Sequence, residues 1–150
     1  MSIQICAAFD SGNIRVVGIE GDRVDLEIVT DHQSDFYQWF HFRAAGAKGR
    51  TVTFRILNAG GSAYAFGWPG YKTRVSTDRA AWRMADTSYA DGVLTFTHNF
   101  DSDIAWFAYF APYSMERHHD LVSRVALQPG VAHRELGRTL DGQPLDCLTI

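Results

Sequence analysis

The stretch FYQWFHFR at residues 36–43 is the most informative about the fold, because six of its eight residues are aromatic or histidine. In an extended strand, successive side chains point to opposite faces. One face of such a strand would carry three phenylalanines and a glutamine, and the other a tyrosine, a tryptophan and a histidine: Phe36, Gln38, Phe40 and Phe42 against Tyr37, Trp39 and His41. We therefore expect a strand with both faces covered.

Short alternating runs of the same kind surround this stretch, at residues 14–29, 51–57, 71–77, 93–100 and 103–111. In the first run Val24, Leu26 and Ile28 share one face and follow a turn at Gly21, which predicts a hairpin. About seven or eight short strands separated by Gly-rich loops favour an antiparallel β-sandwich over parallel βαβ units. The sequence predicts a mainly β domain at residues 1–112.

After Pro112 the sequence pattern changes from strand-like alternation to that of a helix. Ser114 is a good N-cap and Glu116 lies in the first turn of the predicted helix, which should end near Pro129. Its apolar stripe consists of Leu121, Val122, Val125 and Ala126. Residues 131–150 then read as two strands joined at Asp141 and Gly142, a strong hairpin signal. The last strand runs to the final residue without a polar finish, so we expect the chain to be one part of a longer protein.

Composition excludes several classes of function. A chain of 150 residues fits one ordinary domain, and its net charge of −3 provides no basic field to attract nucleic acid. No apolar run approaches the roughly 20 residues of a membrane-spanning helix. The two cysteines, Cys6 and Cys147, are not in a CxxC spacing, and the N-terminus lacks the pattern of a signal peptide. These features predict a reduced, cytoplasmic protein.

The motifs of common catalytic sites are missing from the sequence. It contains no HxxE or HExxH metal motif, no GxSxG nucleophile elbow and no phosphate-binding loop. Two HxxD spacings, at residues 32–35 and 98–101, are too isolated to predict a metal site. His118 and His119 lie about 100° apart on a helix and cannot easily share one ion, so we expect them on a solvated helix face. No catalytic residue, metal ligand or cofactor is predicted within these 150 residues.

The aromatics of residues 64–82 allow two interpretations. In the first, Tyr64, Phe66, Trp68 and Tyr71 cover an edge of the core. In the second, the rings are stacking platforms of a lectin-like, ligand-binding sandwich. A protein-interaction module is a further alternative.

Seven segments in order resemble the front of the cytosolic carboxypeptidases, the deglutamylase-like branch of the zinc metallocarboxypeptidases. They cover essentially the whole chain and are FDSGNIRVV (9–17), YQWFHF (37–42), TFRILN (53–58), WRMADTSY (82–89), LTFTHNF (94–100), WFAYFAPYS (106–114) and LGRTLDGQPLDCLTI (136–150). The family's Phe-acidic-Ser-Gly-Asn mark corresponds to residues 9–13, and its Gln-Trp-Phe-x-Phe mark to residues 38–42.

The resemblance implies a β-sandwich N-terminal domain at residues 1–112, followed at residues 113–150 by the start of an α/β zinc carboxypeptidase domain. The family's zinc motif would follow beyond residue 150, so its ligands have no counterpart here. The complete enzyme would use zinc to remove C-terminal residues, glutamates among them, from peptides or proteins. The expected partners are the protein's own catalytic domain and a peptide C-terminus.

Three residues are candidates for contact with the substrate cleft. Arg83 could meet an acidic peptide, Trp82 adjoins it, and Tyr113 lies at the junction of the two predicted domains. The plainer interpretation places Trp82 in the core and Arg83 on the surface as a solvated charge.

Overall fold

A computed structural model describes residues 2–150. The chain forms two compact units: unit 1 ends at Pro112, and unit 2 comprises Tyr113–Ile150. Among the described residues, unit 1 contains ten strands and two short 3-10 helices: β1 (Gln4–Cys6), β2 (Arg15–Glu20), β3 (Arg23–Glu27), β4 (His41–Ala45), β5 (Thr51–Ile56), η1 (Ala59–Gly61), η2 (Ala65–Gly67), β6 (Arg74–Ser76), β7 (Arg83–Met84), β8 (Asp86–Ala90), β9 (Val93–Asn99) and β10 (Ile104–Ala108).

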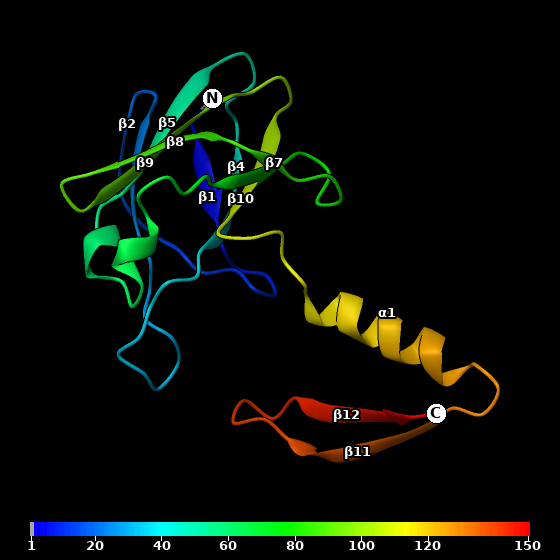
Figure 1. Cartoon of the computed structure of the whole chain (residues 1–150). Coiled ribbons are helices and arrows are strands. Elements are labelled where there is room, and N and C mark those ends of the chain that lie inside the picture. Colours follow the sequence, from blue (N-terminus) through cyan, green and yellow to red (C-terminus); the bar gives the residue numbers. More distant parts are fainter. Residues whose placement is uncertain (1) are drawn as a thin grey trace. The chain divides into compact units, whose positions relative to one another are not determined.

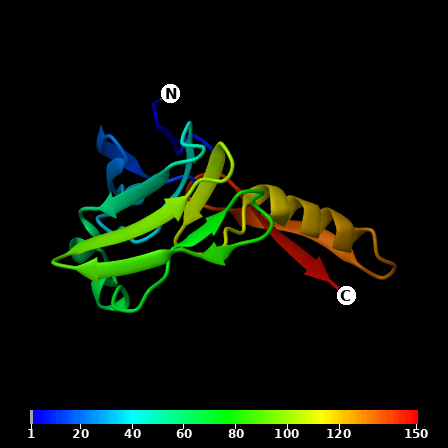
Figure 2. The same cartoon turned by 90° about the horizontal axis from the view of Figure 1, so that it is seen from above.

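The strands of unit 1 form two five-stranded sheets (Figures 1 and 2). Sheet A has the order β1-β4-β10-β6-β7, and sheet B has the order β2-β3-β5-β9-β8. All neighbouring strands are antiparallel except β3 and β5, which are parallel. The chain leaves sheet B after β3, forms β4 in sheet A and returns as β5, which supplies the crossover that a parallel pair needs. The predicted mainly β, antiparallel architecture is confirmed, with this one parallel pair as an exception.

The alternation of apolar and polar residues sets the two faces of sheet B. Val52, Phe54 and Ile56 of β5 are fully buried, and Phe96 of β9 lies directly opposite Phe54. The β8–β9 hairpin turns through residues 91–92, both with positive φ, +52° and +80°. A turn of this kind has the twist that fits the flanking strands, and Asp-Gly is a favoured sequence for it.

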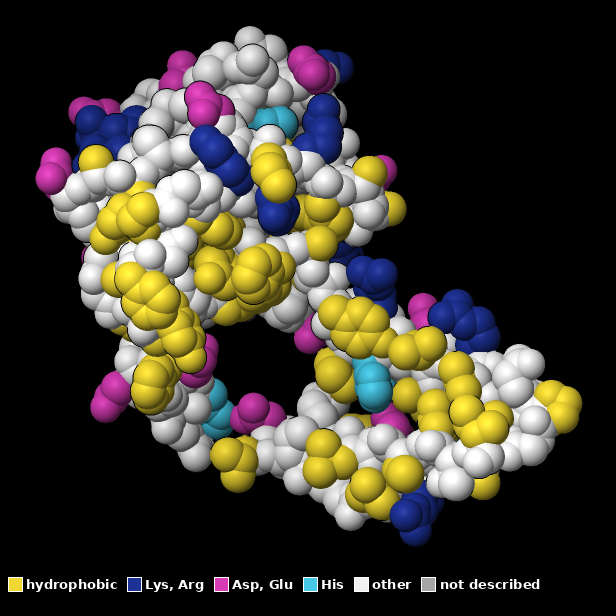
Figure 3. All heavy atoms as spheres, in the orientation of Figure 1, with side chains coloured by type: hydrophobic (Ala, Val, Ile, Leu, Met, Phe, Trp, Pro, Cys, Tyr) yellow, Lys and Arg dark blue, Asp and Glu magenta, His cyan; other side chains and the backbone are white. Residues whose placement is uncertain are grey.

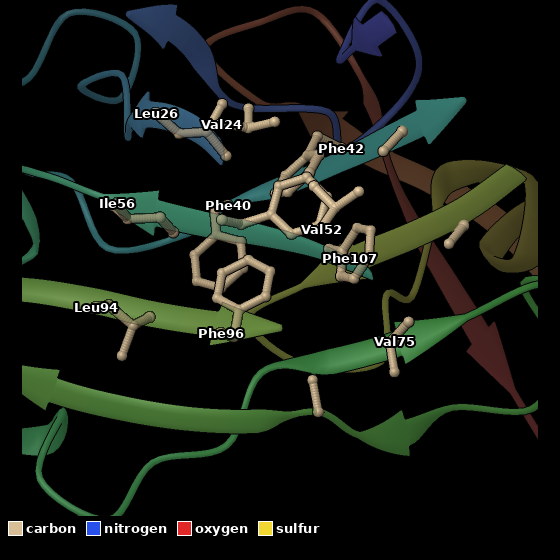
Figure 4. Close-up of a cluster of buried hydrophobic side chains, with 14 of the residues drawn as sticks. Val24, Leu26, Phe40, Phe42, Val52, Ile56, Val75, Leu94, Phe96 and Phe107 are labelled. Atoms are coloured by element: carbon tan, nitrogen blue, oxygen red, sulfur yellow. The ribbon is translucent and has the colours of Figure 1, made fainter. Parts of the chain in front are cut away.

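Phenylalanine rings fill the space between the sheets (Figure 4). The ring centroid of Phe107, from sheet A, lies 4.7 Å from that of Phe54 and 5.5 Å from that of Phe96, both from sheet B. Phe42 lies 5.2 Å from Phe107 and 5.6 Å from Phe54. Each buried ring contributes roughly 1.5–3 kcal/mol through burial, and each such ring pair adds about 0.5–1.5 kcal/mol. These contacts join the two sheets into one core.

The predicted strand at residues 36–43 begins only at His41. Phe40 and Phe42 are fully buried as expected, but the Phe36 side chain is 67% exposed, so the expectation for this residue is wrong. The polar groups of residues 37–38 bond to another loop instead of a strand: Tyr37 Oη donates to the Asn58 carbonyl, and Gln38 Oε1 accepts from the Tyr64 amide. These loop contacts end the alternating pattern before β4.

The loop at residues 9–13 is bonded tightly to the segment that leads into β4. Asn13 Nδ2 donates to the carbonyls of Val29 and Trp39, at 2.9 and 3.0 Å. The Trp39 indole in turn donates to the Ser11 carbonyl at 2.7 Å. A Cβ on Gly12 would lie 2.0 Å from the Ala7 carbonyl oxygen, so only glycine fits there. Two of the sequence marks, at 9–13 and 38–42, therefore form one hydrogen-bonded structure.

Unit 2 consists of helix α1 (Met115–Ala126) and a hairpin of β11 (Ala132–Arg138) and β12 (Pro144–Thr149). The Ser114 side chain accepts from the Arg117 amide, as predicted for the N-cap. The hairpin turn at residues 139–143 includes Gly142 with φ +80°, also as predicted. The half-buried face of α1 includes Val122 and Val125, whereas Leu121 of the predicted stripe is 39% exposed. Figures 1 and 2 show α1 along one side of the hairpin.

Replacing Gly12 by alanine should destabilise unit 1 by about 3 kcal/mol or more, because a backbone carbonyl occupies the position of the new methyl group. Urea unfolding followed by tryptophan fluorescence measures the change. Gly18→Ala is the matched control, since nothing lies within 4 Å of a Cβ at this position of β2. Equal unfolding free energies for the two variants would show that the close approach at Gly12 does not constrain the fold.

Candidate functional site

The outward face of sheet A carries a cluster of aromatic rings around His41, which is 1% exposed. The ring centroid of Phe9 lies 4.9 Å from that of His41, and those of Trp82 and Trp106 lie 5.8 and 6.0 Å from it. His41 Nδ1 is 2.9 Å from Ser11 Oγ. The His41 cluster thus connects the loop at residues 9–13 with β4, β10 and the segment before β7.

His41 is held in its neutral form. Its pKa is lowered to about 4, first by burial and then by the positive charge of Arg79, while Asp10 opposes both effects. Nε2 of His41 has no hydrogen-bond partner within residues 2–150. A neutral imidazole with one bonded nitrogen tolerates such an aromatic enclosure, whereas an imidazolium would need two acceptors. The Ser11–His41 pair therefore acts as a neutral structural contact.

Trp82 belongs to the His41 cluster. Its side chain is half-buried, and its Nε1 donates to the Arg79 carbonyl at 3.2 Å. The Arg79 guanidinium carbon lies 4.7 Å from the centre of the Trp106 ring, a cation–π contact in the same cluster. The ring of Trp82 thus packs on the outward face of sheet A, and not between the sheets as the plainer interpretation expected.

Arg83 lies elsewhere, beside a pocket of about 470 Å³ at the side of the sandwich. The pocket is lined by Val75 of β6, by residues 83–86, by residues 97–99 and by Asp101, so both sheets contribute to it. His98 and Asp101, one of the two HxxD pairs, both line it. Burial lowers the pKa of His98, the Arg83 charge lowers it further, and Asp101 raises it. Arg83 is thus an exposed charge, as the plainer interpretation expected, but it borders a concave site.

Tyr113 belongs to unit 2, where its side chain is 57% exposed and the Arg117 guanidinium carbon lies 5.5 Å from the centre of its ring. Trp82 and Arg83 are adjacent in the chain but contact different clusters, whereas Tyr113 is in the other unit. Within unit 1 the structure therefore does not bring Trp82 and Arg83 into one cluster.

The histidines of α1 are not both on a solvated face, which corrects the sequence prediction. His118 Nε2 lies 2.9 Å from one carboxylate oxygen of Asp146, and His133 Nε2 lies 2.7 Å from the other. These two contacts hold the pKa of Asp146 below its usual range. Only His119 remains exposed as predicted. The contact between α1 and β12 was not visible in the sequence, because Asp146 lies 28 residues from His118.

The aromatics of residues 64–82 divide into two groups. Trp68 is 1% exposed, and its indole donates to the Ala59 carbonyl and to Ser62 Oγ, each at 2.8 Å. Tyr71 packs against Trp68 and donates to the Tyr109 carbonyl at 2.6 Å. Tyr64 and Phe66 are 59% and 82% exposed. Trp68 and Tyr71 therefore cover the core as the first interpretation expected, and a sugar-stacking platform could use only the other two rings.

Within residues 2–150, no three His, Cys, Asp or Glu side chains come together in a way that could hold a metal ion. The same residues contain no helix that is long and apolar enough to cross a membrane. The two cysteines form no disulfide.

Lowering the pH from 7.5 to 5 should reduce the unfolding free energy by about 2 kcal/mol through His41 alone. The unfolded chain binds a proton near pH 6.5, whereas the folded chain resists it until about pH 4, so this stability is present above pH 6.5 and is lost as the pH falls. His41→Asn keeps a polar group at the Nδ1 position. Its free energy of unfolding in urea should fall by about 2 kcal/mol less than that of the unmodified protein over the same pH change. The exposed control His32→Asn should retain the full drop, and an unchanged drop in His41→Asn would contradict the assignment.

Comparison with known proteins agrees with this architecture. A family model described as the cytosolic carboxypeptidase N-terminal domain matches residues 5–110. An uncharacterized protein of Zymomonas mobilis is 55% identical over 150 residues, all of this chain and 40% of that protein. The metallo-carboxypeptidase from Burkholderia cenocepacia superposes with a TM-score of 0.94 at 35% identity, over 98% of this chain and 39% of its own.

The metallo-carboxypeptidase from Pseudomonas aeruginosa, solved in complex with (2-guanidinoethylmercapto)succinic acid, superposes with a TM-score of 0.92 at 38% identity. That match covers 97% of this chain and 39% of that one. The chain thus spans about 40% of the length of each of these three proteins. The resemblance noted in the sequence is confirmed. The chain belongs to the cytosolic carboxypeptidase N-terminal domain family, which forms the N-terminal part of metallocarboxypeptidases.

Proposed function

We propose that these 150 residues are the N-terminal part of a zinc metallocarboxypeptidase that removes C-terminal residues, glutamates among them, from peptides or proteins. In this proposal unit 1 supports the catalytic domain and shapes the access of substrate to it. The family match and the two metallo-carboxypeptidase structures support the assignment. The cytosolic family name supports a cytoplasmic location.

The proposal that unit 1 supports the catalytic domain rests on an exposed aromatic surface of unit 1. We define it by Phe36, Tyr64, Phe66 and Phe110, whose side chains are 67%, 59%, 82% and 54% exposed. Figure 3 shows hydrophobic side chains gathered over the lower half of unit 1, the part that contains η1 and η2 in Figure 1. Monomeric proteins rarely expose a large apolar patch unless another surface covers it.

Contacts between the loops bring these aromatic residues to the same end of the sandwich. The rings of Tyr64 and Phe66 meet edge to face at 5.9 Å, and the amide of Tyr64 bonds to Gln38, two residues after Phe36. The ring of Phe110 lies 4.3 Å from that of Tyr109, which itself packs on Trp68. The exposed rings therefore extend from the buried aromatic core. We propose that the catalytic domain covers them.

Unit 2 supports the proposed domain division at residues 112–113. A single helix on a two-stranded hairpin offers little enclosed apolar volume, and isolated hairpins are marginally stable. Leu127, Leu136 and Leu140 are 83%, 61% and 100% exposed, and no residue of α1 is fully buried. We propose that residues 113–150 begin an α/β catalytic domain whose zinc motif follows later in the protein, and that its remaining elements cover these leucines.

The proposed zinc would be held outside residues 1–150, since the described residues contain no group of side chains that could hold a metal ion. The P. aeruginosa enzyme binds a succinic acid that also bears a guanidino group, which supports a substrate with a carboxylate. Among the three cleft candidates, Arg83 is the one whose chemistry suits a ligand carboxylate. A location of Trp82, Arg83 and Tyr113 beside the cleft remains part of this proposal.

The complete protein should contain about one zinc per chain and should release the terminal residue from a peptide that ends in glutamate. Removing the metal with a chelator should abolish turnover, and adding zinc back should restore it. Residues 1–150 alone should contain no zinc and show no turnover. Intact mass, metal analysis and a peptide assay test this together, and a complete protein of 16.8 kDa without metal would overturn the proposal.

The variant Phe66→Ser tests whether the Phe66 ring contacts the catalytic domain or only covers the core of unit 1. In residues 1–150 the variant should change the unfolding free energy by less than about 0.5 kcal/mol, because the ring is exposed. In the complete protein it should lower the unfolding free energy by about 1.5–3 kcal/mol, the value of burying a phenylalanine side chain. Phe96→Leu is a control that should destabilise both forms, since Phe96 is buried in unit 1. Equal effects of Phe66→Ser in the two proteins would contradict coverage by the catalytic domain.

A further inference from the structure

The pocket beside Arg83 lies where the chain passes from one sheet to the other. Strand β7 is the edge of sheet A, β8 is the edge of sheet B, and Ala85 alone separates them. Arg83 pairs with Val75 across sheet A, and His98 pairs with Val52 across sheet B. Directly paired residues share a face of a sheet, and both valines are buried. Arg83 and His98 therefore lie on the inward faces of opposite sheets, at the side of the sandwich.

Two opposite charges in this pocket have no partner in the described chain. The Arg83 guanidinium and the Asp101 carboxylate make no ion pair or hydrogen bond with any of residues 2–150. Each acts on His98, Arg83 by repelling its protonated form and Asp101 by attracting it. Both charges therefore border one histidine, at the wall of one pocket.

The other charged groups nearby are already paired. Asp86, which also lines the pocket, lies 3.8 Å from Lys72 Nζ. Elsewhere in unit 1, Arg15 pairs with Glu27, and Arg55 lies 3.6 Å from Asp25. Arg83 and Asp101 differ from these groups because neither has an ion-pair or hydrogen-bond partner among residues 2–150. The two charges have opposite signs, so a simple anion would satisfy Arg83 but would be repelled by Asp101.

We propose that the pocket binds a free α-amino acid as a zwitterion, with its carboxylate on Arg83 and its ammonium group on Asp101. An arginine fork matches a carboxylate in two parallel hydrogen bonds, and an ammonium group donates to a carboxylate. The wall of Val75, Met84 and Ala85 provides apolar contact for an aliphatic side chain. A volume of about 470 Å³ lies within the usual range for small-ligand sites.

A free amino acid is also what the proposed hydrolysis would release, so on that proposed function the pocket would bind the reaction product. The binding itself does not depend on that function, because Arg83 and Asp101 lie in unit 1. It can be measured with residues 1–150, which are expected to be inactive. Failure of binding and failure of peptide turnover in the complete protein are therefore distinguishable.

The test is a titration of residues 1–150 with L-leucine, followed by amide NMR. We expect saturable shifts at residues 83–86 and 97–101, with a Kd of about 1 mM or weaker for so small a ligand. Arg83→Gln and Asp101→Asn should each weaken binding at least about tenfold. Arg15→Gln, which removes an arginine on β2 that already has a partner, should leave binding unchanged. The spectrum of each variant also reports whether the chain is folded.

Two analogues of leucine separate a zwitterion site from a simple ion site. 4-Methylpentanoate lacks the ammonium group and 3-methylbutylamine lacks the carboxylate, while both keep the side chain. Each should bind at least about tenfold more weakly than leucine, because it leaves one charge of the pocket unpaired. Equal binding of 4-methylpentanoate would overturn the zwitterion assignment in favour of a plain carboxylate site, such as one for an acidic peptide. Absence of saturable shifts with leucine would overturn the proposal altogether.

Discussion

The packing of phenylalanine rings between the two sheets is the interaction on which the rest of unit 1 depends. Phe42 and Phe107 come from sheet A and Phe54 and Phe96 from sheet B, and their centroids lie 4.7 to 6.4 Å apart. Neither sheet can bury its inward face without the other, since a sheet with one apolar face needs a second layer. The rings therefore determine which residues point inward, and by alternation they also place His41 and Trp106 outward.

The outward face of sheet A shows how a second structure is built on that core. His41 and Trp106 alternate with buried residues of β4 and β10, and the loop at residues 9–13 folds over them. The loop can do so because Gly12 permits a close approach and the Asn13 side chain donates two hydrogen bonds to backbone carbonyls. His41 is compatible with burial under this loop only in its neutral form, because burial disfavours the charged imidazolium. Two segments that mark the family are thus parts of one structural contact.

The surfaces that could contact other groups lie outside this core. The exposed aromatic surface on unit 1 and the exposed leucines of unit 2 are apolar, and they suit contact with further parts of a larger protein. The pocket at Arg83 is different, because it is polar and carries opposite charges. The proposed support of a catalytic domain and the proposed binding of a small charged ligand would therefore involve separate surfaces. A change in one of them is expected to leave the other intact.

By itself, the sequence determined the mainly β architecture, the helix with its cap at Ser114 and the hairpin at Gly142, because these features depend on local periodicity and turn chemistry. It also identified the family through motifs in order. Only the tertiary structure decided that β3 and β5 are parallel, that His118 and His133 share Asp146, and that Arg83 lies beside His98 and Asp101. Those relations join residues far apart in the chain, and no local pattern specifies which distant side chains a folded backbone brings together. The same limit explains why Trp82 and Arg83, neighbours in the sequence, lie in two different environments.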